Sequence, residues 1–137
     1  MLVDIVFPGW GPFPDLAVAE DVPGFIAAHA TALNYDFETF VGGRLTRLGT
    51  RADVETSFAY IQDVRTNAAD ALATVDYFAI ASAIGFDNPW ALFDVYLDTV
   101  ARTCAGATIP AWQDRLGGTD VFTVSHCWAM AESLRVD

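Results

Sequence analysis

The fold of this chain is decided by RADVETSFAYIQDVRTNAADALATV (residues 51–75), the longest regular pattern in the sequence. Apolar residues recur along it at intervals of three and four positions, which places them on one face of an α-helix. They are Val54, Phe58, Ile61, Val64, Ala68, Leu72 and Val75. Thr50 and Asp53 form a capping-box pattern at the start, with aspartate in place of the usual glutamate. The stretch therefore predicts a long amphipathic helix.

Upstream of this helix, the sequence predicts a helix between two short strands. The apolar run over residues 2–7 is typical of a buried strand, and the Pro- and Gly-rich residues 8–14 form a rigid turn region. Asp21 is the expected N-cap of a helix that has Pro23 in its first turn and ends near residue 34. The second strand is expected over residues 37–41.

Downstream, start and stop signals predict three further helical regions. A short apolar helix over residues 76–84 ends at Gly85. The pair Asn88-Pro89 combines an N-cap with a proline at the first helical position, so it begins the next helix. Pro110 is expected to break or restart that helix. A last helix is expected to start near residues 123–125.

Length and composition favour one folded domain of mostly helical structure. The chain has 137 residues, 53% of them hydrophobic, and a positive mean hydropathy. It divides into a strand, loop, helix and strand part (1–50) and a helical part (51–137). Two strands alone do not form a stable sheet. We therefore expect a helical body with a small sheet remnant, or an oligomer that pairs strands across chains.

The charge and the termini limit the classes of partner. A net charge of −11, dispersed along the chain, argues against nucleic acid and anionic membranes as partners. No apolar run is long enough to span a bilayer, and the N-terminus lacks a secretory signal. The chain as given is expected to be cytoplasmic, although an upstream segment could carry a signal. Cys104 and Cys127 are either two reduced thiols or one disulfide.

Two segments, VDIVFPGW (residues 3–10) and FVGGRLTRLGT (residues 40–50), resemble the C-terminal half of metallo-β-lactamase-fold hydrolases. In that family an aspartate at a strand end bridges two metal ions, and Asp4 matches it. A later strand ends in Gly-Gly-His, where this chain has Gly42-Gly43-Arg44. The likeness continues more loosely through residues 88–100 and 126–135. It implies the C-terminal half of an αββα sandwich, here with two strands and about five helices.

The resemblance implies a zinc-dependent hydrolase, in which the metal activates water for attack on an ester, amide or thioester. The family's His-x-His-x-Asp-His motif is absent from this sequence. This chain would therefore be the C-terminal portion of such an enzyme, not competent alone and without a cofactor of its own. A missing N-terminal half would have to complete the site for any small-molecule substrate. The alternative is a non-catalytic interaction or structural protein that self-associates as a homo-oligomer.

Asp4 and Arg44 are the residues on which these alternatives depend. A carboxylate in an apolar strand either binds a cation, pairs with a base or reaches solvent. Arg44 would repel a divalent ion at the position of the family's histidine. With Arg47 and Arg51 it could bind an anion, or Arg44 could pair with a nearby acid; the candidates are Asp4, Asp36, Glu38 and Asp53. We favour pairing and predict an Asp4–Arg44 ion pair.

Histidines and aromatic residues supply the remaining candidates. His29 falls on the apolar face of its helix and is expected in the core, whereas His126 is expected at the surface or as a cap. Most aromatic residues are expected to pack in the core, namely Trp90, Phe93, Tyr96, Trp112 and Trp128. Trp10 and Phe13 lie in the loop that borders the active-site mouth in the similar family, so they are the candidate substrate-side residues.

Overall fold

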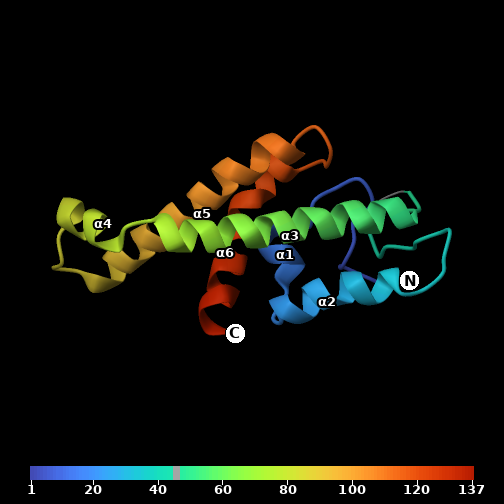
Figure 1. The fold of residues 1–137 in the computed structure, drawn as a ribbon, viewed down its shortest axis with the longest axis horizontal. Coiled ribbons are helices and arrows are strands. Elements are labelled where there is room, and N and C mark those ends of the chain that lie inside the picture. The colour runs from blue at the N-terminus through green and yellow to red at the C-terminus, as the bar shows by residue number, and fades with distance from the viewer. Residues whose placement is uncertain (45–46) are drawn as a thin grey trace.

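The computed structural model describes residues 1–44 and 47–137, and it is mostly helical (Figure 1). Its helices, in chain order, are α1 (Pro14–Val18), α2 (Val22–Leu33), α3 (Arg51–Thr74), α4 (Tyr77–Ile84), α5 (Pro89–Trp112) and α6 (Thr119–Val136). Among the described residues, no helix combines the length and the apolar content needed to cross a bilayer.

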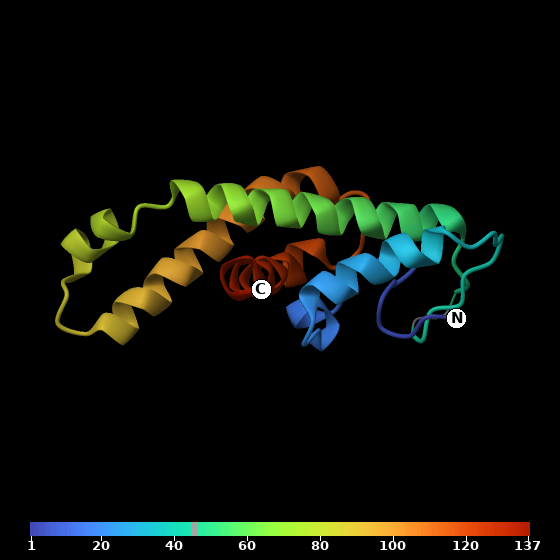
Figure 2. The same cartoon turned by 60° about the horizontal axis from the view of Figure 1, so that its bottom comes forward.

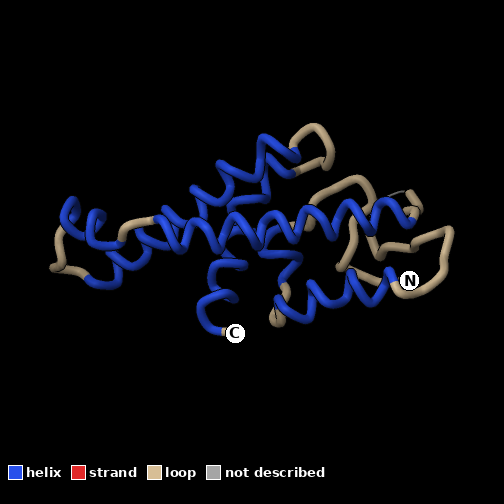
Figure 3. Tube along the Cα trace, viewed as in Figure 1, coloured by secondary structure: helices blue, strands red, loops and turns tan. Residues whose placement is uncertain are grey.

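The two strands predicted over residues 2–7 and 37–41 do not form, and this part of the fold prediction was wrong. The described residues contain no sheet, only isolated bridges such as Leu2 with Gly42 and Phe40 with Gly49 (Figure 3). Asp4 adopts a positive φ of 61°, which interrupts the extended backbone that a strand requires. The apolar side chains of this region pack instead against helices α2 and α3, in a small cluster of Val6, Ala32, Phe40 and Val54.

Helix α3 forms as the pattern of residues 51–75 predicts, and it runs along the length of the molecule (Figures 1 and 2). At its start, the Asp53 carboxylate accepts the backbone N–H of Thr50 at 2.7 Å and the Thr50 hydroxyl at 3.1 Å. The N-caps of α2 and α5 also lie where predicted, because Asp21 accepts from Gly24 N and Asn88 from Ala91 N.

The main core lies where α5 and α6 pack against each other and against α3. Cys104 of α5 and Cys127 of α6 are fully buried there and form a disulfide bond. Of the two states that the sequence left open for these cysteines, the structure has the bonded one. The bond fixes the crossing of two helices whose apolar faces already pack together.

Two helix boundaries differ from the sequence prediction. Pro110 does not break α5, which continues to Trp112. Its missing N–H leaves the carbonyl of Gly106, four residues earlier, on an exposed turn, where water can satisfy it. Helix α6 begins at Thr119, before the predicted 123–125, because Gly118 takes a left-handed φ of 74° and turns the chain directly into the helix.

Helix α1 is an unpredicted left-handed turn. Asp15, Leu16 and Ala17 have φ values of 54°, 51° and 59°, a region that L-residues rarely occupy. Leu16 is fully buried in the main core, so apolar burial stabilises the turn.

At the opposite end from the N-terminal loop, the end of α3, all of α4 and the start of α5 project from the helical body (Figures 1 and 2). We call residues 72–97 the arm. The prediction of a short helix ending at Gly85 is confirmed here, because Asp76 caps α4 at the Phe78 and Ala79 N–H groups, and Gly85 follows its last residue.

Candidate functional site

Asp4 and Arg44 form the ion pair that the sequence analysis predicts. Arg44 Nε lies 2.5 Å from Asp4 Oδ1, and Nη2 lies 3.1 Å from Oδ2, so the guanidinium binds the carboxylate with two hydrogen bonds. The Arg44 guanidinium lowers the pKa of the Asp4 carboxyl below its usual value. Both Asp4 oxygens therefore accept hydrogen bonds from the Arg44 guanidinium.

The other two arginines of this region are also engaged within the chain. Arg47 binds Asp53 with two hydrogen bonds of 2.5 and 3.1 Å, and this pair lowers the pKa of the Asp53 carboxyl. Arg51 donates to the backbone carbonyls of Leu33 and Tyr35 and pairs with Glu55. Pairing with acids and carbonyls thus describes this region better than an open anion site. Residues 45 and 46, which belong to the resemblance, lie outside the described residues.

His29 is buried in the core, as predicted. Its Nδ1 lies 3.0 Å from the Phe25 carbonyl oxygen, and its Nε2 lies 3.1 Å from the Ser57 hydroxyl. Because Nδ1 faces a carbonyl, it carries the proton, and Nε2 accepts from Ser57. Burial lowers the pKa of this imidazole, so the neutral form that these two bonds need is favoured.

His126 is fully buried, and the prediction of a surface or capping residue was wrong. Its Nε2 lies 3.0 Å from the Phe13 carbonyl oxygen and its Nδ1 2.7 Å from the Tyr60 hydroxyl, which also lies 2.8 Å from the Thr123 hydroxyl. Nε2 must donate to the carbonyl, so Nδ1 accepts from Tyr60 and Tyr60 accepts from Thr123. We call His126, Tyr60 and Thr123 the buried triad.

Burial lowers the pKa of His126 to about 4 and raises that of Tyr60 to about 12. Both groups are therefore neutral at pH 7. Each polar side-chain atom of the triad has a hydrogen-bond partner, and these bonds join α3, α6 and the N-terminal loop. Sequence reasoning missed it because no local spacing links these residues.

Trp10 and Phe13 contact different parts of the chain. Gly11 N donates to Gly117 O and Gly117 N to Gly9 O, both at 3.0 Å, so the Trp10 loop is tied to the turn between α5 and α6. Phe13 packs between Phe7 and Phe122, with ring centroids at 4.9 and 6.0 Å. Their role beside a substrate stays a prediction.

Metal-ligating residue types do not gather in the described part of the chain: no three His, Cys, Asp or Glu side chains come close enough together to hold an ion. The chemistry-bearing groups named above have internal partners instead. The cysteines form a disulfide, the histidines are bonded in the core, and Asp4 is paired. Two apolar features remain at the surface of the described residues: a pocket and a group of exposed side chains.

One such feature is a pocket of about 650 Å³ between α2, the first two residues and residues 35–41. The segments that line it lie at the end of the molecule opposite the arm (Figure 1). Its lining is mostly apolar and small, and it includes Phe37 and Phe40.

The other feature is the arm. Trp90 was predicted to pack in the core, and this prediction was wrong. Its side chain is 83% exposed, whereas Trp112 is buried and bonded to Asp63. The neighbouring exposed apolar residues of the arm are Phe78 (70%), Ile84 (52%), Phe86 (61%) and Val95 (39%). Trp90 lies at the second position of α5, two residues before Leu92, the first residue that this helix buries. Apolar spacing along the helix therefore did not reveal that the Trp90 side chain is exposed.

Comparisons of this chain with protein-family models, with curated proteins and with solved structures give no match.

Proposed function

We propose that this chain acts as a non-catalytic binding protein and that the arm is its contact surface. The observation that carries the proposal is the group of large apolar side chains that the arm exposes, with Trp90 the most exposed among them. Large exposed apolar surfaces on folded proteins commonly mark sites that contact a partner. Tryptophan and phenylalanine are also among the residues that contribute most at protein interfaces.

The packing of the arm supports this proposal. Tyr77 of α4 lies edge-on to Tyr96 of α5 with ring centroids 5.5 Å apart, and Tyr96 stacks on Phe93 at 6.2 Å. Ala81 and Leu92 are buried between the two helices. The arm therefore has its own packed interior, and its outer apolar residues are additional to what folding the arm requires.

The alternative is the hydrolase that the resemblance implies, with a second chain supplying the other metal ligands. Asp4 would then have to release Arg44 before it could ligate zinc. The two proposals differ in metal content. We expect the purified chain, equilibrated with zinc and desalted, to retain much less than one zinc per chain by elemental analysis, and Asp4→Asn to leave that content unchanged. Stoichiometric zinc that Asp4→Asn removes would overturn the non-catalytic proposal.

The cellular compartment belongs to the same proposal. The sequence predicts a cytoplasmic protein, whereas a buried disulfide such as Cys104–Cys127 is more typical of oxidising compartments. Rapid acid quenching of source cells, followed by alkylation of the denatured protein and mass measurement, shows which state the cell maintains, because both cysteines are buried in the folded chain. Alkylated Cys104 and Cys127 would support the cytoplasm, and unmodified, bonded cysteines an oxidising compartment.

A further inference from the structure

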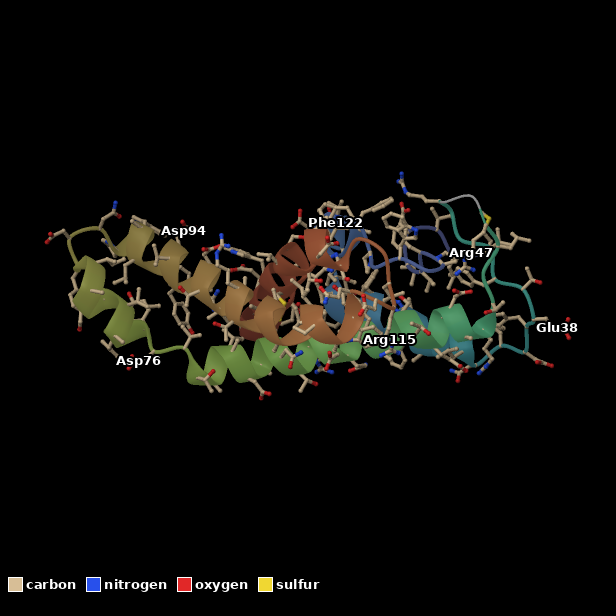
Figure 4. The ribbon with its side chains drawn as sticks, turned by 90° about the horizontal axis from the view of Figure 1, so that it is seen from above. Glu38, Arg47, Asp76, Asp94, Arg115 and Phe122 are labelled. Carbon is tan, nitrogen blue, oxygen red and sulfur yellow. A yellow bond between two sulfur atoms is a disulfide. The ribbon has the colours of Figure 1, made fainter. Side chains whose placement is uncertain are left out.

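The arm carries negative charge beside its apolar residues. From Thr66 to Ala101 the sequence has five aspartates and no arginine or lysine: Asp70, Asp76, Asp87, Asp94 and Asp98. Asp98 pairs with Arg102 at 2.7 Å. Among the described residues, none of the other four forms an ion pair with an arginine. Figure 4 labels two of them, Asp76 before α4 and Asp94 in α5.

The aspartates and the apolar residues alternate around the end of the arm. Phe86, Asp87 and Trp90 follow one another across the loop into α5, and all three are exposed. Asp94 and Val95 follow one helical turn later and are also exposed. Trp90 and Asp94 are four residues apart in α5 and so lie on the same helix face. A ligand that covers Trp90 therefore lies beside the Asp94 carboxylate, where a positive charge is favoured and a negative charge is disfavoured.

We propose that the arm binds a cationic amphipathic helix of a partner protein, a proposal that rests on the proposed function and specifies its partner. The apolar face of that helix would cover Phe78, Phe86 and Trp90, and its lysine or arginine side chains would lie against Asp87 and Asp94. An amphipathic helix presents both kinds of side chain on adjoining faces, as this surface requires. A second arm fits less well, because it would bring three more aspartates (Asp76, Asp87 and Asp94) to the same contact, and an anionic membrane would also be repelled by them.

The test uses a fluorescently labelled peptide of about 18 residues, or five helical turns, made of leucine on one face and lysine on the other. A matched peptide has glutamate in place of every lysine. Fluorescence anisotropy measures binding to the full chain. We expect the lysine peptide to bind, with weaker binding as salt rises from about 50 to about 300 mM, and the glutamate peptide not to bind.

Variants locate the contact. Phe78→Ser with Trp90→Ser should weaken binding of the lysine peptide at least about tenfold, the scale on which aromatic anchors act at interfaces. The control, Leu48→Ser with Val121→Ser, also removes two exposed apolar residues but lies outside the arm. Asp87→Asn with Asp94→Asn should weaken binding several-fold and reduce its salt dependence. Its control, Asp36→Asn with Asp114→Asn, makes the same charge change elsewhere and should have no such effect. Circular dichroism checks that each variant remains folded.

Several results would overturn the proposal. They are no binding of the lysine peptide, equal binding of the glutamate peptide, or equal losses in the arm variants and their controls. Sedimentation showing dimers that Trp90→Ser disperses would identify a second copy as the occupant instead. Co-sedimentation with phosphatidylserine vesicles that depends on Trp90 would identify a membrane. Either outcome would leave the arm as a binding surface, whereas the zinc measurement above tests the non-catalytic function separately.

Discussion

Acidification should destabilise this protein through His126 before most carboxylates begin to titrate. In the folded chain the imidazole is neutral: its Nε2 donates to the Phe13 carbonyl and its Nδ1 accepts from Tyr60. A proton added to Nδ1 would face the Tyr60 hydroxyl hydrogen. Burial also penalises the charged form and is the largest cause of the pKa decrease from 6.5 to about 4.

The sign and size of this change in the free energy of unfolding follow from the difference in proton binding between the folded and unfolded chains. Above pH 6.5 His126 is neutral in both states and contributes no pH dependence. Below pH 6.5 the unfolded chain binds a proton that the folded chain rejects, so the free energy of unfolding falls, and the loss saturates below the folded pKa of about 4. The full loss is about 3 kcal/mol, of which about 2 kcal/mol should be seen by pH 5. His29, whose pKa is also lowered, acts in the same direction.

Urea unfolding followed by circular dichroism at pH 7.5 and pH 5 measures this loss. His126→Gln should be less stable than the parent chain at pH 7.5, because it removes a paired buried group, and should lose about 2 kcal/mol less on acidification. His29→Gln is the control that removes the other buried imidazole. A His126→Gln chain with the parent's pH dependence, or an NMR titration of His126 near pH 6.5, would refute the reasoning.

Three further predictions concern stability. The double variant Cys104→Ala with Cys127→Ala should have a free energy of unfolding about 3 kcal/mol lower than the parent, since the lost disulfide spans 23 positions. A reductant should destabilise the parent and not this variant, and equal destabilisation of both would contradict the prediction. Tyr60→Phe should cost about 1–3 kcal/mol in denaturant unfolding, because His126 and Thr123 lose their partner; a neutral effect would mean that water replaces the hydroxyl. Ala17→Gly should raise the melting temperature, because glycine removes about 1 kcal/mol of backbone strain at a φ of 59°. The control Ala129→Gly in α6 should lower the melting temperature. Equal decreases in the two variants would argue against the left-handed turn.

The helices could be predicted because their signals are local. Asp21, Asn88 and the Thr50/Asp53 pair each cap backbone groups within three residues, so the sequence alone specifies the contact. Apolar spacing then extends each helix from its cap. The start of α6 escaped prediction because Gly118 acts there through a positive φ and not through a side-chain cap.

The sequence predictions were wrong where contacts between distant residues determine the local structure or the burial of a side chain. The short apolar runs at residues 2–7 and 37–41 have the composition of strands, but α2 and α3 bury them without a sheet partner. His126 is bonded to residues 66 and 113 positions away, so no spacing could reveal its burial. Asp4 and Arg44 are 40 positions apart, so no local spacing indicates their ion pair, which was predicted from the resemblance and from their opposite charges.

The disulfide also changes what a cut in the backbone would do. Cys104 and Cys127 enclose residues 113–118, the turn between α5 and α6, within one covalent loop. A protease that cleaves after Arg115, which is exposed in this turn, would therefore leave two pieces still linked through sulfur. Such a nicked chain would run as one species on a non-reducing gel and as two after reduction, and both halves of the helical core would remain tethered.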